Sequence, residues 1–210
     1  MKVYKINPQR PELEIIQTAA AVVKKGGVVA FPTTGLYGLG VDAFNAAGVD
    51  RLFDIKQRFR DKPILILIDS PTQLQGLAAV IPDTAVRIMD HFWPGGVTLV
   101  FEAAAGVPEI LTANTGKIGI RLAGHPVAAA LVSAAKGPIT GTSANFSGAV
   151  GCRRVEDLDP ALIRRLDFII DSGPLKGGRG STVVDVTGKR LRILREGEVG
   201  EREILALVGR

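Results

Sequence analysis

Residues 56–68 read KQRFRDKPILILI, a run that joins the end of a helical pattern to a strand. Before it, Val49, Leu52 and Phe53 recur at the spacing of one helical face, and the same face returns at Lys56. The aliphatic half of the run is typical of a buried strand. Lys56 is therefore expected on the inward side of the helix, where a lysine either extends to solvent or meets a negative partner inside a cleft.

The first half of the run places cations at positions 56, 58, 60 and 62, with Asp61 among them. A charge run of this kind is most often a solvated surface. Here the helical phase of Lys56 and the strand directly behind the run favour the other interpretation, an anion grip at the end of a buried surface.

The whole chain has 210 residues, of which 46% are hydrophobic, and its composition shows no break of the kind that marks a linker. A single domain over residues 1–210 is therefore predicted. The net charge of +5 suits an anionic partner such as a nucleotide or RNA. The first residues lack an apolar stretch of signal-peptide length, and no apolar run is long enough to cross a bilayer. We expect a cytoplasmic protein without a membrane partner.

Helical and strand patterns alternate along the chain. Helices are expected near residues 11–25, 84–92, 127–135, 161–166 and 203–208, and strands near 28–31, 97–102, 118–122, 139–142, 168–171, 181–187 and 191–195. Residues 32–40 read PTTGLYGLG, a glycine-rich loop without the Lys-Ser/Thr ending of a P-loop or the spacing of a dinucleotide site. Interleaved elements predict an α/β or α+β fold, with a sheet covered by helices.

Metal and nucleophile chemistry find little support in the sequence. The single cysteine, Cys152, permits neither an internal disulfide nor a cysteine-based zinc site, and His91 and His125 have no partners at metal-ligand spacing. No site with protein-ligated metal is expected. The absence of a Gly-x-Ser-x-Gly elbow disfavours a serine hydrolase of the α/β type. Hydroxyl groups and cations remain as the groups that could carry chemistry.

Three segments carry polar groups suited to a ligand. In residues 118–122, IGIRL, strand alternation places Arg121 opposite the aliphatic face, beside the bare Gly119. Residues 141–148, GTSANFSG, end a strand with small side chains that can approach phosphate or ribose. Ser181 follows a glycine-rich backbone that can wrap an anion. Taken singly, these segments are equally compatible with a solvent-facing arginine, a plain turn and a mobile surface loop.

The last strand pattern, residues 191–195, contains two arginines. Alternation places Arg195 on the face of Leu191 and Ile193, and Arg192 on the opposite face. Arg195 is therefore the functional candidate, and Arg192 is expected in solvent.

These blocks together resemble the YrdC/TsaC family of threonylcarbamoyl-AMP synthases, over about Ala30 to Gly197. The matching pieces are Pro32-Thr33 with Tyr37-Gly38-Leu39-Gly40, Lys56-x-Arg58 with Lys62, Trp93-Pro94-Gly95, Arg121 with His125-Pro126, Thr142-Ser143-Ala144-Asn145, Ser181-Thr182 and Arg195-x-Gly197. The resemblance implies a twisted mixed β-sheet flanked by helices around one large, positively charged cavity, in the single-domain form of the family.

Members of this family condense L-threonine, bicarbonate and ATP into threonylcarbamoyl-adenylate and release pyrophosphate. The product supplies a downstream tRNA threonylcarbamoyl transferase, which modifies the adenosine next to the anticodon. Positioning and charge stabilisation provide most of such catalysis, so no conspicuous nucleophile is needed. Mg²⁺ would accompany ATP and be held mainly by phosphates and water.

The resemblance also implies a role for each matching residue. It assigns the ATP phosphates to Lys56 and Arg58 as the catalytic pair, with help from Lys62. It assigns further nucleotide contacts to Ser143, Asn145 and Arg195, and the threonine to Thr33, Arg121 and Ser181, with Arg121 pairing the carboxylate in a bidentate bond.

The chain departs from the family pattern at several positions. Gly35 stands where members often have threonine or alanine, and Thr34 replaces a common acidic residue. Phe59 replaces the usual proline, Leu67 replaces a histidine that contacts threonine in many members, and Glu196 replaces another proline. Some single-domain members also lack the histidine.

Two alternatives remain open at this stage. The first is a non-catalytic paralogue that uses the same basic cavity to bind double-stranded RNA or tRNA; an aromatic content of 5% makes base-stacking platforms scarce but does not oppose recognition by shape. The second is a related domain that makes carbamoyl-adenylate from carbamoyl phosphate during hydrogenase maturation. Such domains are usually embedded in larger proteins with zinc-finger-like cysteines, whereas this chain has one cysteine.

Overall fold

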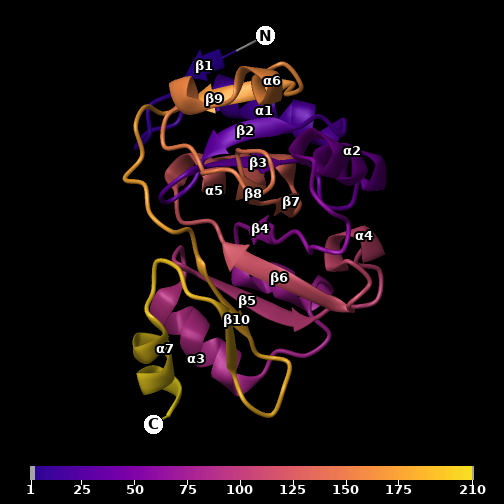
Figure 1. Cartoon of the computed structure of the whole chain (residues 1–210), viewed down its shortest axis with the longest axis vertical. Helices are drawn as coiled ribbons and strands as arrows, with labels where there is room; N and C mark the ends of the chain where they lie inside the picture. The colour runs from indigo at the N-terminus through magenta and orange to yellow at the C-terminus, as the bar shows by residue number, and fades with distance from the viewer. Residues whose placement is uncertain (1–2, 210) are drawn as a thin grey trace.

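The computed structural model describes residues 3–209 and has two lobes, each built on one mixed sheet (Figure 1). The five-stranded sheet has the order β1-β9-β2-β3-β8 and the six-stranded sheet the order β11-β10-β5-β6-β4-β7. The strands of the first are β1 Val3–Lys5, β2 Val29–Pro32, β3 Tyr37–Gly40, β8 Thr142–Ser143 and β9 Phe168–Asp171. Those of the second are β4 Ile66–Ile68, β5 Val97–Glu102, β6 Lys117–Leu122, β7 Ile139–Thr140, β10 Thr182–Asp185 and β11 Arg192–Arg195.

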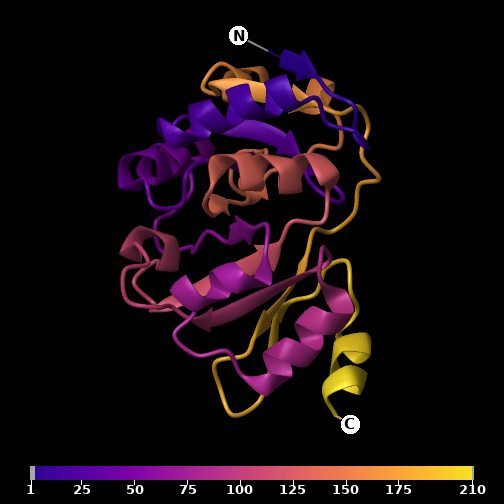
Figure 2. The same cartoon turned by 180° about the vertical axis from the view of Figure 1, so that it is seen from behind.

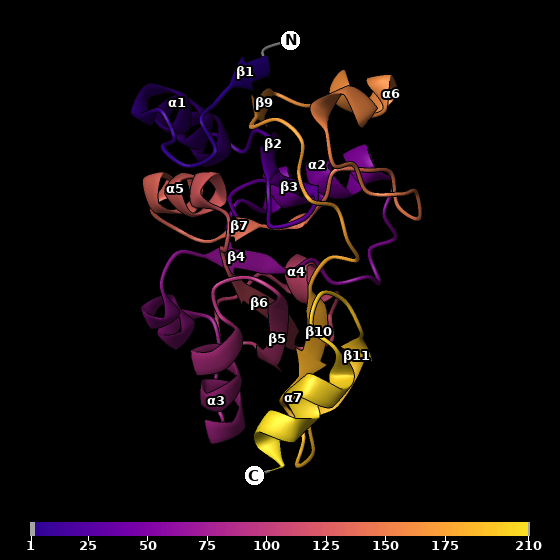
Figure 3. The same ribbon diagram turned by 90° about the vertical axis from the view of Figure 1, so that its left-hand side faces the viewer.

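Helices cover both sheets. The α-helices are α1 Leu13–Lys24, α2 Ala46–Lys56, α3 Asp83–Phe92, α4 Glu109–Thr112, α5 Pro126–Ala135, α6 Pro160–Ile163 and α7 Glu201–Val208, and the short 3₁₀ helices are η1 Pro71–Gly76 and η2 Val155–Asp157. Helices α1 and α5 lie side by side on the upper lobe, seen from behind in Figure 2. Helices α3 and α7 lie together at the opposite end of the molecule (Figure 3). Among residues 3–209, no helix is long and apolar enough to span a membrane.

The apolar spacing of the first helix has the structural result that periodicity predicts. Ile16, Ala19, Ala20 and Val23 are all buried, and they pack in one cluster with α5 and the five-stranded sheet. The helix ends before Gly26, which has a φ of +79°, a backbone conformation that glycine adopts without steric cost.

The sequence predicted one sheet, whereas the structure has two. The strand expected over residues 139–142 is in fact two short strands, because β7 pairs with β4 and β8 pairs with β3. The chain changes sheet at Gly141, whose backbone N–H donates to the Leu65 carbonyl. A Cβ at this position would lie 2.8 Å from Leu67 Cγ, so the passage is too close to other chain segments for a side chain.

The glycine-rich segment 32–40 is not the loop that the sequence predicted. Its second half is β3, which forms an antiparallel hairpin with β2. The glycines serve close packing, because a Cβ on Gly40 would lie 2.8 Å from both the Thr140 carbonyl oxygen and Phe31 Cε1. A glycine-rich sequence therefore forms a buried strand here.

The chain passes between the two sheets three times, and these passages bring the candidate residues together. Strands β1 to β3 belong to one sheet, β4 to β7 to the other, β8 and β9 to the first again, and β10 and β11 to the second. The passages are residues 57–65, Gly141 and residues 172–181. Arg58 lies in the first, Ser143 just after the second, and Ser181 at the end of the third.

Candidate functional site

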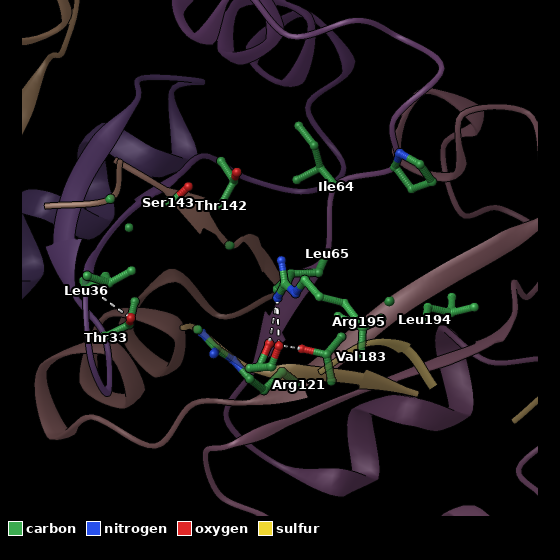
Figure 4. A pocket seen from close by; sticks show the side chains of 18 of the residues that line it. Thr33, Leu36, Ile64, Leu65, Arg121, Thr142, Ser143, Val183, Leu194 and Arg195 are labelled. Carbon is green, nitrogen blue, oxygen red and sulfur yellow. Dashed lines mark hydrogen bonds between the residues drawn. The ribbon is translucent and has the colours of Figure 1, made fainter. Parts of the chain in front are cut away.

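A cavity of about 720 Å³ is lined by residues of both lobes. Its volume is within the range of small-molecule sites in proteins. Figure 4 shows Thr33 and Ser143 on the side of the five-stranded sheet, facing Arg121 and Arg195 of the six-stranded sheet. The predicted residues Thr33, Arg58, Arg121, Ser143, Asn145, Ser181 and Arg195 all line this cavity.

Strand β6 forms part of the cavity floor through strict alternation. Ile118 and Ile120 are fully buried in the core, whereas Lys117, Gly119 and Arg121 line the cavity. The prediction that Arg121 and Gly119 share the face opposite the aliphatic residues is confirmed. The missing side chain of Gly119 leaves space in the cavity beside Leu65, since a Cβ there would already lie 3.3 Å from Leu65 Cβ.

Arg121 is a buried cation with unused donor capacity. Its Nε is buried and has no hydrogen-bond partner among the described residues. Burial lowers the pKa of Arg121 to about 10, Glu198 opposes that shift, and the nearby Arg195 adds to it. An anion bound here would supply the missing acceptor and add to the counter-charge of Glu198.

Arg195 reaches the cavity because of an irregularity in its strand. The register between β10 and β11 shifts between Val183 and Val184, so Arg195 pairs with Val183 while Ile193 pairs with Val184. As a result Ile193 packs against the core, whereas both Leu194 and Arg195 line the cavity. The prediction that Arg195 and Ile193 share a face was therefore wrong, although Arg195 lines the cavity and Arg192 is exposed as expected.

Ser181 lies at the centre of a hydrogen-bonded group on this floor. Its carbonyl accepts a bond from Arg195 Nη2 at 2.7 Å, and the same nitrogen lies 3.5 Å from Ser181 Oγ. Ser181 Oγ is also 2.7 Å from Thr98 Oγ1, and both residues are almost fully buried although they border the cavity. Arg195 and Thr98 together fix the position of Ser181.

Lys56 is buried, at 1% exposure, as its helical phase predicted. Its Nζ donates to the carbonyls of Ser143 and Asn145 and to Asn145 Oδ1, and Lys56 is not among the residues that line the cavity. The negative partners are thus carbonyl oxygens of residues 143–145 rather than an open phosphate site. Burial, followed by the nearby Arg58, lowers the pKa of Lys56 to about 7.

Two further cations of the charged run, Arg58 and Lys62, differ from each other. Arg58 lines the cavity, and its Nε and Nη2 donate to the carbonyls of Lys62 and Pro63, which hold the guanidinium in place. Burial and then the charge of Arg195 lower the pKa of Arg58, against an opposing effect of Asp61. Lys62 does not line the cavity; it is exposed, with Nζ 5.6 Å from the centre of the exposed Phe59 ring.

Thr33, Ser143 and Asn145 present oriented polar groups on the other wall. Thr33 Oγ1 donates to the Leu36 carbonyl at 2.6 Å, which leaves its lone pairs free. Ser143 Oγ donates to Asn145 Oδ1, and Asn145 Nδ2 donates to the Ala149 carbonyl. These bonds order residues 143–149 as part of the cavity wall.

The departure at Gly35 has a structural counterpart. Gly177 donates its backbone N–H to the Gly35 carbonyl at 2.9 Å, and a Cβ on Gly35 would lie 2.4 Å from the Gly177 carbonyl oxygen. The absence of a side chain at Gly35 lets the segment 177–180, which lines the cavity from Gly178 onward, lie directly against the β2–β3 turn.

Sequence reasoning missed several lining residues. Thr98, Lys117, Arg179 and Asp185 all border the cavity. Strand alternation could have indicated Lys117, which lies two residues from Gly119 and four from Arg121. Lys117 Nζ bonds Asp185 Oδ2 at 3.1 Å and Thr187 Oγ1 at 2.6 Å. Within residues 3–209 there is no cluster of three or more His, Cys, Asp or Glu side chains suited to a metal ion.

The charge of the lining is strongly one-sided. In the described part of the chain, five basic residues face the cavity against one acidic residue, and they are Arg58, Lys117, Arg121, Arg179 and Arg195 against Asp185. Since Asp185 is already paired with Lys117, the other cations meet no carboxylate from the lining. Fold and site define a two-lobed α/β protein with a basic cavity between its sheets.

Comparison with known proteins places this chain within a family. A Sua5/YciO/YrdC family model, described as "Telomere recombination", matches residues 21–197. A threonylcarbamoyl-AMP synthase of Pyrococcus abyssi is 35% identical over 92% of this chain and 57% of its own length. A putative threonylcarbamoyl-AMP synthase of Mycobacterium tuberculosis is 35% identical over 92% of this chain and 89% of its own length. The chain belongs to the Sua5/YciO/YrdC family.

Solved structures agree with this assignment. The structure of P. abyssi Sua5 complexed with L-threonine has a TM-score of 0.93 and 33% identity, and the match covers all of this chain and 61% of that one. Escherichia coli YciO has a TM-score of 0.84 and 28% identity, with 97% and 98% covered. The predicted family and fold class are confirmed. The chain spans little more than half the length of the P. abyssi and Bacillus subtilis relatives, at 57% and 56%.

Proposed function

We propose that this chain synthesises threonylcarbamoyl-adenylate from L-threonine, bicarbonate and ATP. The observation that carries the proposal is the buried Nε of Arg121, which has no hydrogen-bond partner within residues 3–209 and lies in a cavity where cations outnumber carboxylates. Such a site favours a ligand that brings negative charge of its own, and both a threonine carboxylate and a triphosphate do so. The relatives from P. abyssi and B. subtilis, which match 92% of the chain, are named threonylcarbamoyl-AMP synthases, and this supports the choice of ligands.

In the proposed complex, L-threonine lies between the two lobes. Arg121 pairs with its carboxylate through the guanidinium fork, and Ser181 donates a further bond. Thr33 accepts a bond from the amino group, a role supported by its hydroxyl proton being donated to the Leu36 carbonyl. The threonine complex reported for P. abyssi Sua5 supports an amino-acid site in this fold.

The ATP phosphates lie against Arg58, Arg195, Ser143 and Asn145 in this proposal. Burial and then the charge of Arg195 lower the pKa of Arg58, and a polyanion between the two guanidinium groups relieves that repulsion. Lys56 does not line the cavity and acts through Ser143 and Asn145, which do. Its hydrogen bonds to Ser143 and Asn145 hold the residues that contact the nucleotide, so we assign it a positioning role. Lys62 remains a proposed outer phosphate contact.

The reaction then proceeds in two steps. The threonine nitrogen attacks the carbon of bicarbonate, and a carbamate forms with loss of water. A carbamate oxygen attacks the α-phosphorus, the bond to the β-phosphate oxygen breaks, and pyrophosphate leaves with the electron pair. The guanidinium groups of Arg58 and Arg195 stabilise the charge that develops on the phosphate oxygens. Mg²⁺ enters with ATP as part of the substrate, because the one carboxylate of the lining is engaged by Lys117.

The proposal is tested by measuring pyrophosphate release from ATP and bicarbonate, with and without L-threonine. The expected result is release that depends on threonine. A complementary readout is mass spectrometry of the adenylate product. If threonine brings no increase while the protein binds tRNA with a steep dependence on salt, the non-catalytic RNA-binding alternative is supported instead. If carbamoyl phosphate replaces threonine and bicarbonate as co-substrate, the carbamoyl-adenylate alternative is supported.

The chain offers a matched pair of arginine variants on one strand. Arg195 lines the cavity and Arg192 is exposed on the same strand, β11. We expect Arg195→Ala to reduce kcat/KM for ATP at least ~10-fold, since ~1.4 kcal/mol of transition-state stabilisation corresponds to tenfold in rate. Arg192→Ala is expected to behave as the wild type. Equal losses in both variants would indicate a general effect of charge and contradict the phosphate assignment.

The product of this reaction is an unstable mixed anhydride, so we propose transfer to a downstream tRNA threonylcarbamoyl transferase in the cytoplasm. Direct binding of tRNA or double-stranded RNA by this chain is a separate proposal, supported by its net charge of +5. Electrophoretic mobility of labelled tRNA at increasing salt measures it.

A further inference from the structure

Thr98 is a buried hydroxyl that the proposed reaction does not yet use. It lies on β5, is 1% exposed, and borders the cavity. Its Oγ1 is 2.7 Å from Ser181 Oγ, and this is its one side-chain hydrogen bond among the described residues. Its methyl group lies against Gly119, where a Cβ would be 3.4 Å from Thr98 Cγ2. The threonine side chain is thus held in one orientation, with its hydroxyl toward Ser181.

The pairing of the two hydroxyls limits how Ser181 can meet a ligand. A hydroxyl has one proton to donate and two lone pairs that accept. If Ser181 donated its proton to Thr98, it would offer only lone pairs to the cavity. Arg195 Nη2 can only donate, and it lies 3.5 Å from Ser181 Oγ, so the lone pairs of Ser181 already face one donor. A carboxylate on Arg121 accepts bonds only, so Ser181 can bond it only when its own proton is free.

We infer that Thr98 is a positioning residue for amino-acid binding, which acts by donating its hydroxyl proton to Ser181 and thereby directing the Ser181 proton to the substrate carboxylate. The inference rests on the proposed function, because it takes the ligand of Arg121 to be an amino acid. Thr98 touches no substrate in this arrangement. Its effect passes entirely through Ser181, and this separates it from a residue that merely fills space.

The inference is tested with Thr98→Val, which keeps the shape of the side chain and removes the donor. The expected result is a rise in KM for L-threonine of about tenfold, with KM for ATP within about twofold of the wild type. Thr98→Ser restores the hydroxyl without the methyl group and is expected to recover most of the affinity. A calorimetric titration of L-threonine into each variant gives the same comparison without turnover.

Two controls separate positioning from folding. Thr112→Val is a matched change, because Thr112 is also buried and hydroxyl-bonded but does not line the cavity; it should leave KM for threonine unchanged. In the Ser181→Ala background, Thr98→Val is expected to have no further effect on KM for threonine, since there is no serine hydroxyl left to direct.

The outcomes distinguish the two proposals. If the wild type needs threonine for pyrophosphate release but Thr98→Val keeps its KM for threonine, the role of Thr98 is wrong and the proposed function stands. The role of Thr98 is also wrong if the effects of Thr98→Val and Ser181→Ala are additive, or if kcat and melting temperature fall while KM does not change. If the wild type shows no threonine dependence at all, both proposals are overturned.

Discussion

Arg121 combines burial, positive charge and an Nε without a hydrogen-bond partner in the described part of the chain, and a bound anion would offset the cost of this combination. Lysine at this position would keep the charge but lose the planar fork that matches a carboxylate. We therefore expect Arg121→Lys to raise KM for L-threonine at least ~10-fold, while KM for ATP changes by less than ~3-fold. Steady-state pyrophosphate release with each substrate varied in turn measures this, and a rise confined to ATP would contradict the assignment.

Lys56 predicts a dependence of stability on pH. Burial lowers its pKa in the folded protein from 10.5 to about 7, so between these pH values the unfolded chain holds a proton that the folded chain has released. The free energy of unfolding therefore gains a contribution that rises with pH across this window, and below it both states carry the proton.

The matched variant for this effect is Lys56→Met, which keeps most of the chain length without the amine. Urea unfolding of both proteins at several pH values from 7 to 10.5 is expected to show the stability of the wild type rising relative to the variant. A constant difference across the range would mean that Lys56 does not titrate there.

The sequence predicts the side of an element on which a residue lies, but it does not predict the residue's partners in distant segments. The inward position of Lys56 followed from helical spacing, and that of Arg121 from strand alternation, because both patterns are local. The partners of Lys56 could not be predicted, since they are carbonyl groups of Ser143 and Asn145 and belong to a distant segment. Thr98 was missed for the same reason: its hydroxyl matters only through the register that brings β5 beside β10.

At the level of elements, the hairpin of β2 and β3 depends on glycine for packing rather than for flexibility. A Cβ on Gly40 would meet the Thr140 carbonyl oxygen, which cannot move without displacing a strand. We expect Gly40→Ala to destabilise the protein by ~1–3 kcal/mol, the usual cost of overpacking. Gly137→Ala is the matched control, because nothing lies within 4 Å of a Cβ there, and we expect it to be neutral or slightly stabilising. Thermal unfolding of the two variants measures the difference.

The same hairpin explains why the sequence-based prediction of segment 32–40 was wrong. Glycine-rich segments usually form loops, and the pattern contains nothing that reveals how closely Thr140 and Phe31 approach. By contrast, strands β5 and β9 have the bounds that the sequence predicted, 97–102 and 168–171, because each is an apolar run with a clear end. Regular alternation was sufficient for β6, whereas the register shift beside β11 left no signal in the sequence.

For the whole molecule, a cavity lined by both lobes predicts that ligands hold the lobes together. Thr33 and Ser143 come from one lobe, and Arg121 and Arg195 from the other. We expect a non-hydrolysable ATP analogue and L-threonine, added together, to raise the melting temperature by more than the sum of their separate effects. Ligand at ~100 times its Kd adds ~2.7 kcal/mol of stability for each independent site, and shared contacts add a coupling term.

Differential scanning fluorimetry with each ligand alone and with both measures this coupling. Arg192→Ala, outside the cavity, is expected to show the same synergy as the wild type, and Arg121→Lys much less. Purely additive shifts in the wild type would show that the two ligands bind without influencing each other.

The three passages of the chain between the sheets also decide how this protein can be divided. Each lobe is assembled from two separate stretches of sequence, so no single cut releases either lobe as one continuous fragment. A gene for one lobe alone would have to join ends that are distant in the natural chain. A recombination event with a relative anywhere between β1 and β11 would therefore mix strands from two parents in at least one sheet, and between β4 and β9 it would do so in both sheets.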